Sequence, residues 1–102
     1  MRRFRKGIPT VINVLGHDYR VEFVKPRELG KKSVGECLHS KRVIRLSNKL
    51  EGDYLLETLD HELEHAWHFE SGEENLYTSK EIEKKCDAFA SFRSSLRKQG
   101  VP

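Results

Sequence analysis

Two histidines separated by three residues stand in the stretch DHELEH, near the middle of the chain. If this stretch is helical, His61 and His65 lie one turn apart on the same face, and both imidazoles reach one point. Imidazoles in this arrangement are typical ligands of a tetrahedral zinc ion. Glu62 directly follows the first histidine, where its carboxylate would border the ion and could take a proton from a metal-bound water. The motif therefore predicts a metal-dependent hydrolytic site.

A catalytic zinc ion needs a third protein ligand, and the run EIEKKCDAFASF contains candidates for it. Glu83 and Asp87 are four residues apart, on one side of a second predicted helix. We expect Glu83 to bind the ion and Asp87 to accept a hydrogen bond from a ligand histidine. Glu81 is the competing ligand, although it projects about 160° away from Glu83 around the helix. The interval between His65 and Glu83 is long enough for a loop and an antiparallel return.

Less specific roles fit the remaining histidines and two tyrosines. His68 follows His61 by seven residues, about 10 Å along a helix, which is too far to share the ion and predicts a surface or cleft-lining position. Four further residues could stabilise an oxyanion, although a solvent-exposed role is the default expectation for each, and the sequence does not choose among them. These are His17, His39, Tyr54 and Tyr77.

Two helices are predicted to carry these side chains. The first covers residues 53–70, ends at Ser71-Gly72, and places its histidines opposite an apolar arc. The second begins at a capping box formed by Thr78 and Glu81, and ends near Gln99. The apolar arc of the first contains Leu55, Leu56, Leu59, Leu63, Ala66 and Trp67, and that of the second contains Ile82, Cys86, Phe89, Phe92 and Leu96.

The first half of the chain favours short strands. TVINVL (10–15) and YRVEFV (19–24) flank a glycine-containing turn and predict a hairpin, and residues 36–39 and 41–46 predict another with its turn at His39-Ser40. A loop is expected between them, at 27–35. We therefore predict one α+β domain over residues 1–102, zincin-like, with a short antiparallel sheet of three to four strands packed on the two helices. Val43–Leu46 is the expected edge strand for an extended peptide substrate.

The net charge of +3 conceals an uneven distribution along the chain. Residues 1–50 carry +9, residues 51–87 carry −9, and residues 88–102 add +3. Apart from the terminal RRFRK, the basic residues are scattered singly, which favours solvated faces over a nucleic-acid partner. No apolar run reaches the length of about 20 residues that a membrane span needs, and a soluble, cytoplasmic protein is expected. Cys37 and Cys86 have no paired spacing and predict free thiols.

The run RVIRLSNKLEGDYLLETLDHELEHAWH, followed by EKKCDAFA, resembles the ImmA/IrrE-type metallopeptidases, small gluzincins of bacteria, phages and mobile elements. The resemblance covers about residues 41–92 and implies a repressor-like protein substrate. In this chain Glu64 stands where that family usually has glycine, which adds negative charge beside the metal, and Asp87 stands where asparagine is commoner. The helix-turn-helix or sensory domain that members often carry has no counterpart. The implied cofactor is Zn²⁺, with His61, His65 and Glu83 as ligands and Glu62 as catalytic base.

The sequence thus favours a zinc metallopeptidase that hydrolyses a protein or peptide substrate. The alternative is a non-catalytic zinc-binding regulator or inhibitor, which binds a protein or nucleic-acid partner through its basic N-terminal half. A metal-free nucleic-acid-binding module is the third interpretation. Metal content separates the third from the first two, and a Glu62→Gln variant separates the first from the second.

Overall fold

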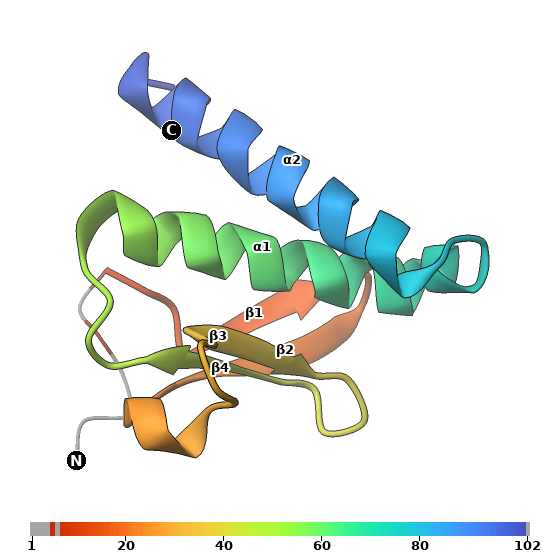
Figure 1. Cartoon of the computed structure of the whole chain (residues 1–102), viewed down its shortest axis with the longest axis horizontal. Helices are drawn as coiled ribbons and strands as arrows, with labels where there is room; N and C mark the ends of the chain where they lie inside the picture. Colours follow the sequence, from red (N-terminus) through yellow and green to blue (C-terminus); the bar gives the residue numbers. More distant parts are fainter. Residues whose placement is uncertain (1–4, 6, 102) are drawn as a thin grey trace.

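A four-stranded sheet and two long helices form three layers, with the first helix in the middle (Figure 1). The computed structural model describes residue 5 and residues 7–101, so that only Arg5 of the basic run RRFRK is covered. The predicted α+β class is confirmed. The strands are β1 (Val11–Val14), β2 (His17–Val24), β3 (Gly35–Leu38) and β4 (Val43–Ser47), and the helices are α1 (Gly52–Ser71) and α2 (Ser79–Lys98).

β1 and β2 form the first predicted hairpin around a two-residue turn. Leu15 and Gly16 both have positive φ, 50° and 90°, as a turn that follows the twist of the strands requires. The side chain of Asn13 supports the turn, because its Oδ1 accepts a hydrogen bond from the Gly16 N–H at 3.0 Å. His17, which the sequence placed in the turn, is instead the first residue of β2.

The central pair of the sheet is parallel, and this corrects the expectation of an antiparallel sheet. The strand order is β1-β2-β4-β3, with β2 parallel to β4 and β3 antiparallel to β4. Four of the five residues of β4 are buried, whereas every residue of β3 is half-buried, so the more apolar strand occupies the interior. The edge strands are therefore β1 and β3, and Val43–Leu46 is not an edge strand. The turn between them covers residues 39–42, longer than the predicted His39-Ser40.

α1 docks on one face of the sheet by its apolar stripe. Leu55, Leu59 and Ala66 are buried in the core, where each large side chain contributes about 1.5–3 kcal/mol by its removal from water. Trp67 was predicted on the same arc but is 37% exposed, because it projects about 120° around the helix from Leu55. Facing α1 from the sheet are the largest fully buried side chains of the strands, Tyr19, Phe23, Ile44 and Leu46.

α2 packs on the side of α1 away from the sheet (Figure 1). It begins with the predicted capping box, in which Thr78 Oγ1 accepts from the Glu81 N–H at 3.1 Å and Glu81 Oε1 accepts from the Thr78 N–H at 2.8 Å. Phe92 was expected in the apolar arc but is 58% exposed. The residues that are buried follow each other at intervals of four and are Ile82, Cys86, Ala90 and Ser94.

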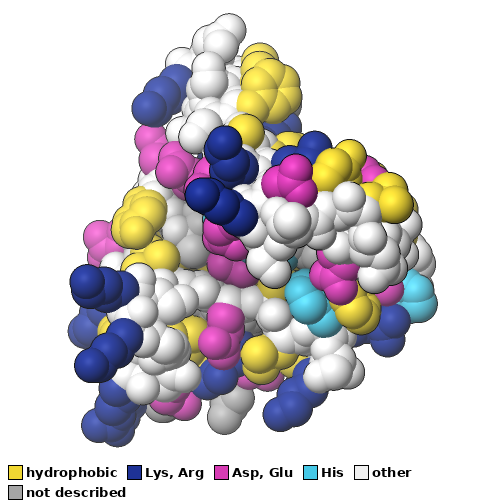
Figure 2. Space-filling model, turned by 45° about the vertical axis from the view of Figure 1, so that its right-hand side comes forward, with side chains coloured by type: hydrophobic (Ala, Val, Ile, Leu, Met, Phe, Trp, Pro, Cys, Tyr) yellow, Lys and Arg dark blue, Asp and Glu magenta, His cyan; other side chains and the backbone are white. Residues whose placement is uncertain are grey.

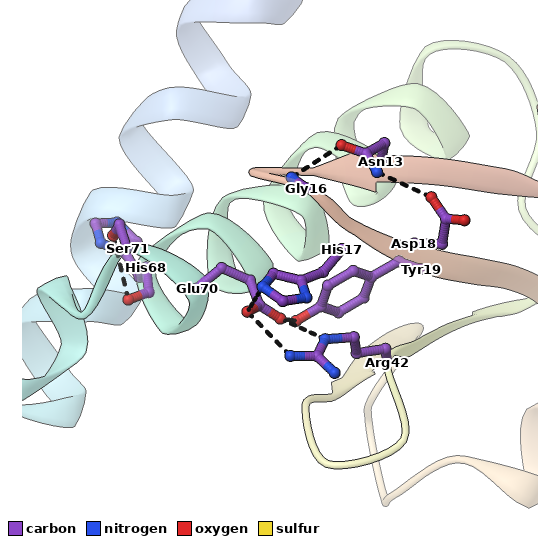
Figure 3. Close-up of polar contacts among 9 residues, drawn as sticks. All are labelled: Asn13, Gly16, His17, Asp18, Tyr19, Arg42, His68, Glu70 and Ser71. Carbon is purple, nitrogen blue, oxygen red and sulfur yellow. Dashed lines mark hydrogen bonds and ion pairs between the residues drawn. The ribbon is translucent and has the colours of Figure 1, made fainter.

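Glu70 joins the last turn of α1 to the sheet (Figure 3). Its Oε2 accepts hydrogen bonds from Tyr19 Oη at 2.7 Å and from Arg42 Nε at 2.9 Å, and His17 Nε2 lies 3.5 Å from its Oε1. The hydrogen bonds from Arg42 and then Tyr19 lower the pKa of Glu70 to about 2. Burial, followed by the bond to Glu70, raises the pKa of Tyr19 above its usual range.

We expect Glu70→Gln to weaken the acid dependence of folding. A carboxylate whose pKa is lowered on folding stabilises the fold fully above its unfolded pKa, about 4.3, and loses that contribution as the pH falls towards the folded value. Urea unfolding at each pH should therefore show a smaller loss of unfolding free energy in this variant between about pH 5 and pH 2. Tyr19→Phe should give an intermediate result. Identical acid profiles for wild type and Glu70→Gln would contradict the role given to this carboxylate.

Candidate metal centre

His61 and His65 project from one side of α1 and their ring nitrogens meet. The Nε2 atoms lie 3.2 Å apart, and both side chains are about four-fifths buried. Two ligands at about 2.0–2.1 Å from a tetrahedral zinc ion stand about 3.3–3.4 Å apart, which is close to this separation. Two imidazole nitrogens that face each other so closely are favourable only with a proton or a cation between them. Burial lowers the pKa of His65, which favours the neutral imidazole that binds metals.

Glu83 reaches this pair from the first half of α2. Its Oε1 lies 2.8 Å from His61 Nε2 and its Oε2 lies 2.9 Å from His65 Nε2. One ligand atom from each of the three residues falls within 4.8 Å of the others, and they form a group that could hold a metal ion. The carboxylate would retreat by only about half an ångström to share a tetrahedral ion with the imidazoles. Two imidazoles and one carboxylate are also a donor set of catalytic zinc sites.

Asp87 lies one turn after Glu83 on α2 and contacts the far side of the His61 ring. Its Oδ1 is 3.0 Å from His61 Nδ1, although the aspartate side chain itself is 70% exposed. If Nδ1 donates to this carboxylate, the lone pair of Nε2 is free to bind a metal. The structure thus brings together the four residues that the sequence nominated as ligands and as the histidine's partner.

Two other acidic residues near the motif do not join the cluster. Glu81 is held in the capping box with Thr78, which removes it as the competing ligand. Glu64 lies 3.3 Å from His68 Nε2, so its charge is directed along α1 and not at the ligand atoms. His68 itself is 3% exposed, which corrects its predicted surface or cleft position. It projects about 20° from His61 around the helix, and the Trp67 ring lies edge-on to it with ring centres 5.1 Å apart.

Glu62 is the buried polar residue of the motif. It points within about 20° of Leu55 around α1, so it belongs to the arc that faces the sheet, and it is 7% exposed. Its carboxylate has no hydrogen-bond partner among the described residues, and its oxygens are not fully enclosed. Burial, reinforced by the charges of Glu83 and Glu36 and opposed by His61, raises the pKa of Glu62 to about 7. A carboxyl group with such a pKa can both accept and return a proton near neutral pH.

Gly35, at the start of β3, makes the close approach of the edge strand to Glu62 possible. A Cβ at this position would lie 3.3 Å from Glu62 Oε2 and 3.0 Å from Thr58 Cγ2. Any larger residue would therefore displace the strand or the carboxylate. From the sequence Gly35 was expected in a loop and not at the site, although a glycine next to a strand often marks such a close approach.

The cluster opens into hollows between β3 and the two helices. One, of about 450 Å³, extends from Glu62 past Lys32, Glu57 and Tyr54 towards Ser91 on α2. A smaller one, of about 290 Å³, lies over His61, His65 and Glu83 and is bounded by residues of β3 and the turn after it. Figure 2 shows acidic, basic and apolar side chains interspersed on the face turned to the viewer, with histidine side chains towards its right.

The four candidates for an oxyanion donor are separated by their positions. His17 belongs to the Glu70 contacts at the opposite hairpin (Figure 3). Tyr54 lines the larger hollow and is 57% exposed. The Lys85 ammonium group lies over the Tyr77 ring, 4.4 Å from its centre. His39 borders the smaller hollow next to the three candidate ligands.

Comparison of the chain with models of known families, with curated proteins and with solved structures found no match. Conclusions about its activity therefore depend on the geometry of this cluster. No helix in the described part of the chain is both long enough and apolar enough to cross a membrane.

We expect the purified protein to bind about one Zn²⁺ per chain through His61, His65 and Glu83. Replacing any of these three residues by alanine removes a ligand and should sharply lower the affinity, measured by competition with a chromophoric chelator. Glu81→Ala is the matched control on α2 and should retain the affinity. Undiminished zinc binding by Glu83→Ala would show that another residue completes the site.

Asp87→Ala should reduce zinc affinity by about 10- to 100-fold, less than a ligand replacement does, because Asp87 orients His61 without binding the ion. Asp87→Asn should lie between the alanine variant and wild type, since its amide oxygen still accepts a hydrogen bond from Nδ1. The same chelator competition measures all three proteins. Wild-type affinity in the alanine variant would leave Asp87 as a surface residue without influence on the metal.

Proposed function

We propose that this chain is a small zinc-dependent metallopeptidase that hydrolyses a peptide bond in a protein or peptide substrate. The observation that carries the proposal is the position of Glu62, a buried carboxylate without a hydrogen-bond partner among the described residues, next to the cluster of His61, His65 and Glu83. A carboxylate with a purely structural role is normally either exposed to solvent or, when it is buried, paired with a hydrogen-bond donor. The resemblance to ImmA/IrrE-type metallopeptidases leads to the same proposal.

In the proposed hydrolysis His61, His65 and Glu83 would hold the metal, and Glu62 would transfer a proton. A zinc ion bound by the cluster would polarise the scissile carbonyl and acidify water. Glu62 takes one proton from the attacking water as the water oxygen bonds to the carbonyl carbon. It then returns that proton to the amide nitrogen as the C–N bond breaks, which leaves a carboxylic acid and an amine. Atoms and charge balance without a further reactant.

The edge strand β3 is the proposed docking site of the substrate backbone. It is the last strand of the sheet on the side of the cluster, and Gly35 places it against Glu62. An extended peptide that pairs with this edge would run across the smaller hollow with its backbone carbonyl groups near the candidate metal ligands. The resemblance adds a repressor-like regulator as the proposed class of substrate.

Glu62→Gln should abolish cleavage of β-casein, an unstructured substrate, by the zinc-loaded protein. The amide cannot accept the proton from water, whereas zinc binding depends on other residues. Gel electrophoresis and release of new amino termini measure the cleavage, and circular dichroism and zinc titration should show an unchanged fold and affinity. Glu57→Gln, a matched change in the wall of the larger hollow, should keep its activity.

Equal cleavage by wild type and Glu62→Gln would reject the assigned mechanism. If the wild-type, zinc-loaded protein cleaves neither casein nor a repressor encoded next to it, the chain is a zinc-binding regulator and not a peptidase. Absence of zinc binding would exclude both of these functions.

A further inference from the structure

His39 is a third imidazole beside the cluster, and its ring is held in place by two contacts. It stacks on the ring of Phe69 from α1, with ring centres 4.6 Å apart and planes at 7°. Its Nδ1 lies 3.4 Å from the Sγ atom of Cys37 on β3. Neither Phe69 nor Cys37 is needed to bind a metal, so these contacts fix a histidine that the proposed mechanism has not yet used.

The partner of Nδ1 determines what Nε2 can do. Burial, followed by the charges of nearby carboxylates, raises the pKa of Cys37 to about 12, so the sulfur keeps its hydrogen. A thiol is a weak donor, and when it donates to Nδ1 the ring proton must be on Nε2. Among the described residues, Nε2 of His39 has no hydrogen-bond partner. In that tautomer Nε2 carries an N–H donor that is available to a ligand.

This donor borders the space where the proposed reaction would take place. His39 and Glu62 both line the hollow of about 290 Å³ that also exposes His61, His65 and Glu83. His39 also lines a third hollow, which extends past His65 to the start of α2. Glu62 instead lines the hollow of about 450 Å³ on the other side. A carbonyl group over the cluster would thus lie between a proton acceptor and a hydrogen-bond donor.

We propose that His39 is a catalytic residue whose Nε2–H binds the carbonyl oxygen of the scissile peptide bond, with Cys37 as the residue that positions its proton. This inference rests on the proposed function. As water adds to the carbonyl carbon, the π-electron pair moves onto the oxygen, and a fixed N–H donor stabilises the negative charge that develops there. The oxygen loses that charge when the C–N bond breaks and the carbonyl forms again.

The test is the cleavage of labelled β-casein by zinc-loaded variants. Loss of one oxyanion donor typically lowers kcat by about 10²- to 10³-fold, so His39→Ala should show a loss of this size with little change in KM. His39→Gln, which keeps an N–H donor, should recover part of it. Zinc affinity should stay at the wild-type value in both variants, because His39 is not among the ligands.

A second measurement does not depend on turnover. The ¹⁵N NMR shifts of the His39 ring should show a protonated Nε2 and an unprotonated Nδ1 in the wild-type protein. Cys37→Ala should lose this preference and part of the kcat, and Cys37→Ser, whose hydroxyl group can still donate, should restore both. A merely structural role of Cys37 would not move the tautomer together with the rate.

The possible failures can be told apart. A wild-type protein that cleaves casein no faster than Glu62→Gln overturns the proposed function, and this inference with it. Normal turnover by wild type together with an unchanged kcat in His39→Ala overturns the inference alone. So does a protonated Nδ1 in the wild-type spectrum, or a loss of kcat in Tyr54→Phe that His39→Ala does not show, since the donor would then be Tyr54.

Discussion

The packing of α1 on the sheet is the constraint on which the rest of the structure depends. Leu55, Leu59 and Ala66 fix the rotation of this helix about its own axis by their burial in the core. Because the side chains of a helix are spaced about 100° apart, that rotation also fixes the directions of His61 and His65, about 120° and 80° from the buried stripe. The histidines thereby lie at the margin between the sheet and α2. A rotation by one residue would expose the leucines and move both imidazoles away from α2.

The same rotation explains why Glu62 is buried. It occupies a position in the stripe that an apolar residue would normally fill, and the carboxylate faces the backbone of Gly35 on β3. Burying an ionisable group without a partner costs folding free energy, about 1–3 kcal/mol for an unsatisfied polar group and more for a charged one. At Glu62 the apolar stripe of α1 is therefore interrupted by an ionisable residue, against the amphipathic pattern of the rest of the helix. Violations of this kind concentrate at functional sites, where the raised pKa is useful.

Local patterns in the sequence were enough to predict the two helices, the capping box of α2 and both hairpins, because each depends on residues close together in the chain. The meeting of His61, His65 and Glu83 was predictable as well, since a short loop between two helices permits little else. The parallel pairing of β2 with β4 was not predictable in this way. It depends on which strand of the second hairpin, β3 or β4, is more apolar and therefore occupies the interior position beside β2. This choice is set by the packing of the whole sheet and not by residues close together in the chain.

Errors at single residues have the same origin. The helical wheel shows which side chains share a face, but not how much of that face the next element covers. His68 is buried although it lies on the histidine face of α1, and Phe92 is exposed although it was expected in the apolar arc of α2. Periodicity alone does not encode these differences in packing. The contact between Cys37 and His39 likewise depends on the twist of an edge strand and on Phe69, which lies 30 residues further along the chain.

The position of α2 links the candidate site to the stability of the fold. Of the buried residues in its stripe, Cys86, Ala90 and Ser94 are small and remove little apolar surface from water, so the helix is held on α1 with modest hydrophobic energy. Glu83 adds negative charge near Glu62, and these like charges oppose the approach of α2 to α1. A bound cation would relieve that repulsion and bridge the two helices through His61, His65 and Glu83. At a free ion concentration 100 times Kd it would stabilise the fold by about 2.7 kcal/mol, provided the unfolded chain does not bind it. Metal binding and the packing of α2 are therefore coupled, since each favours the geometry that the other requires.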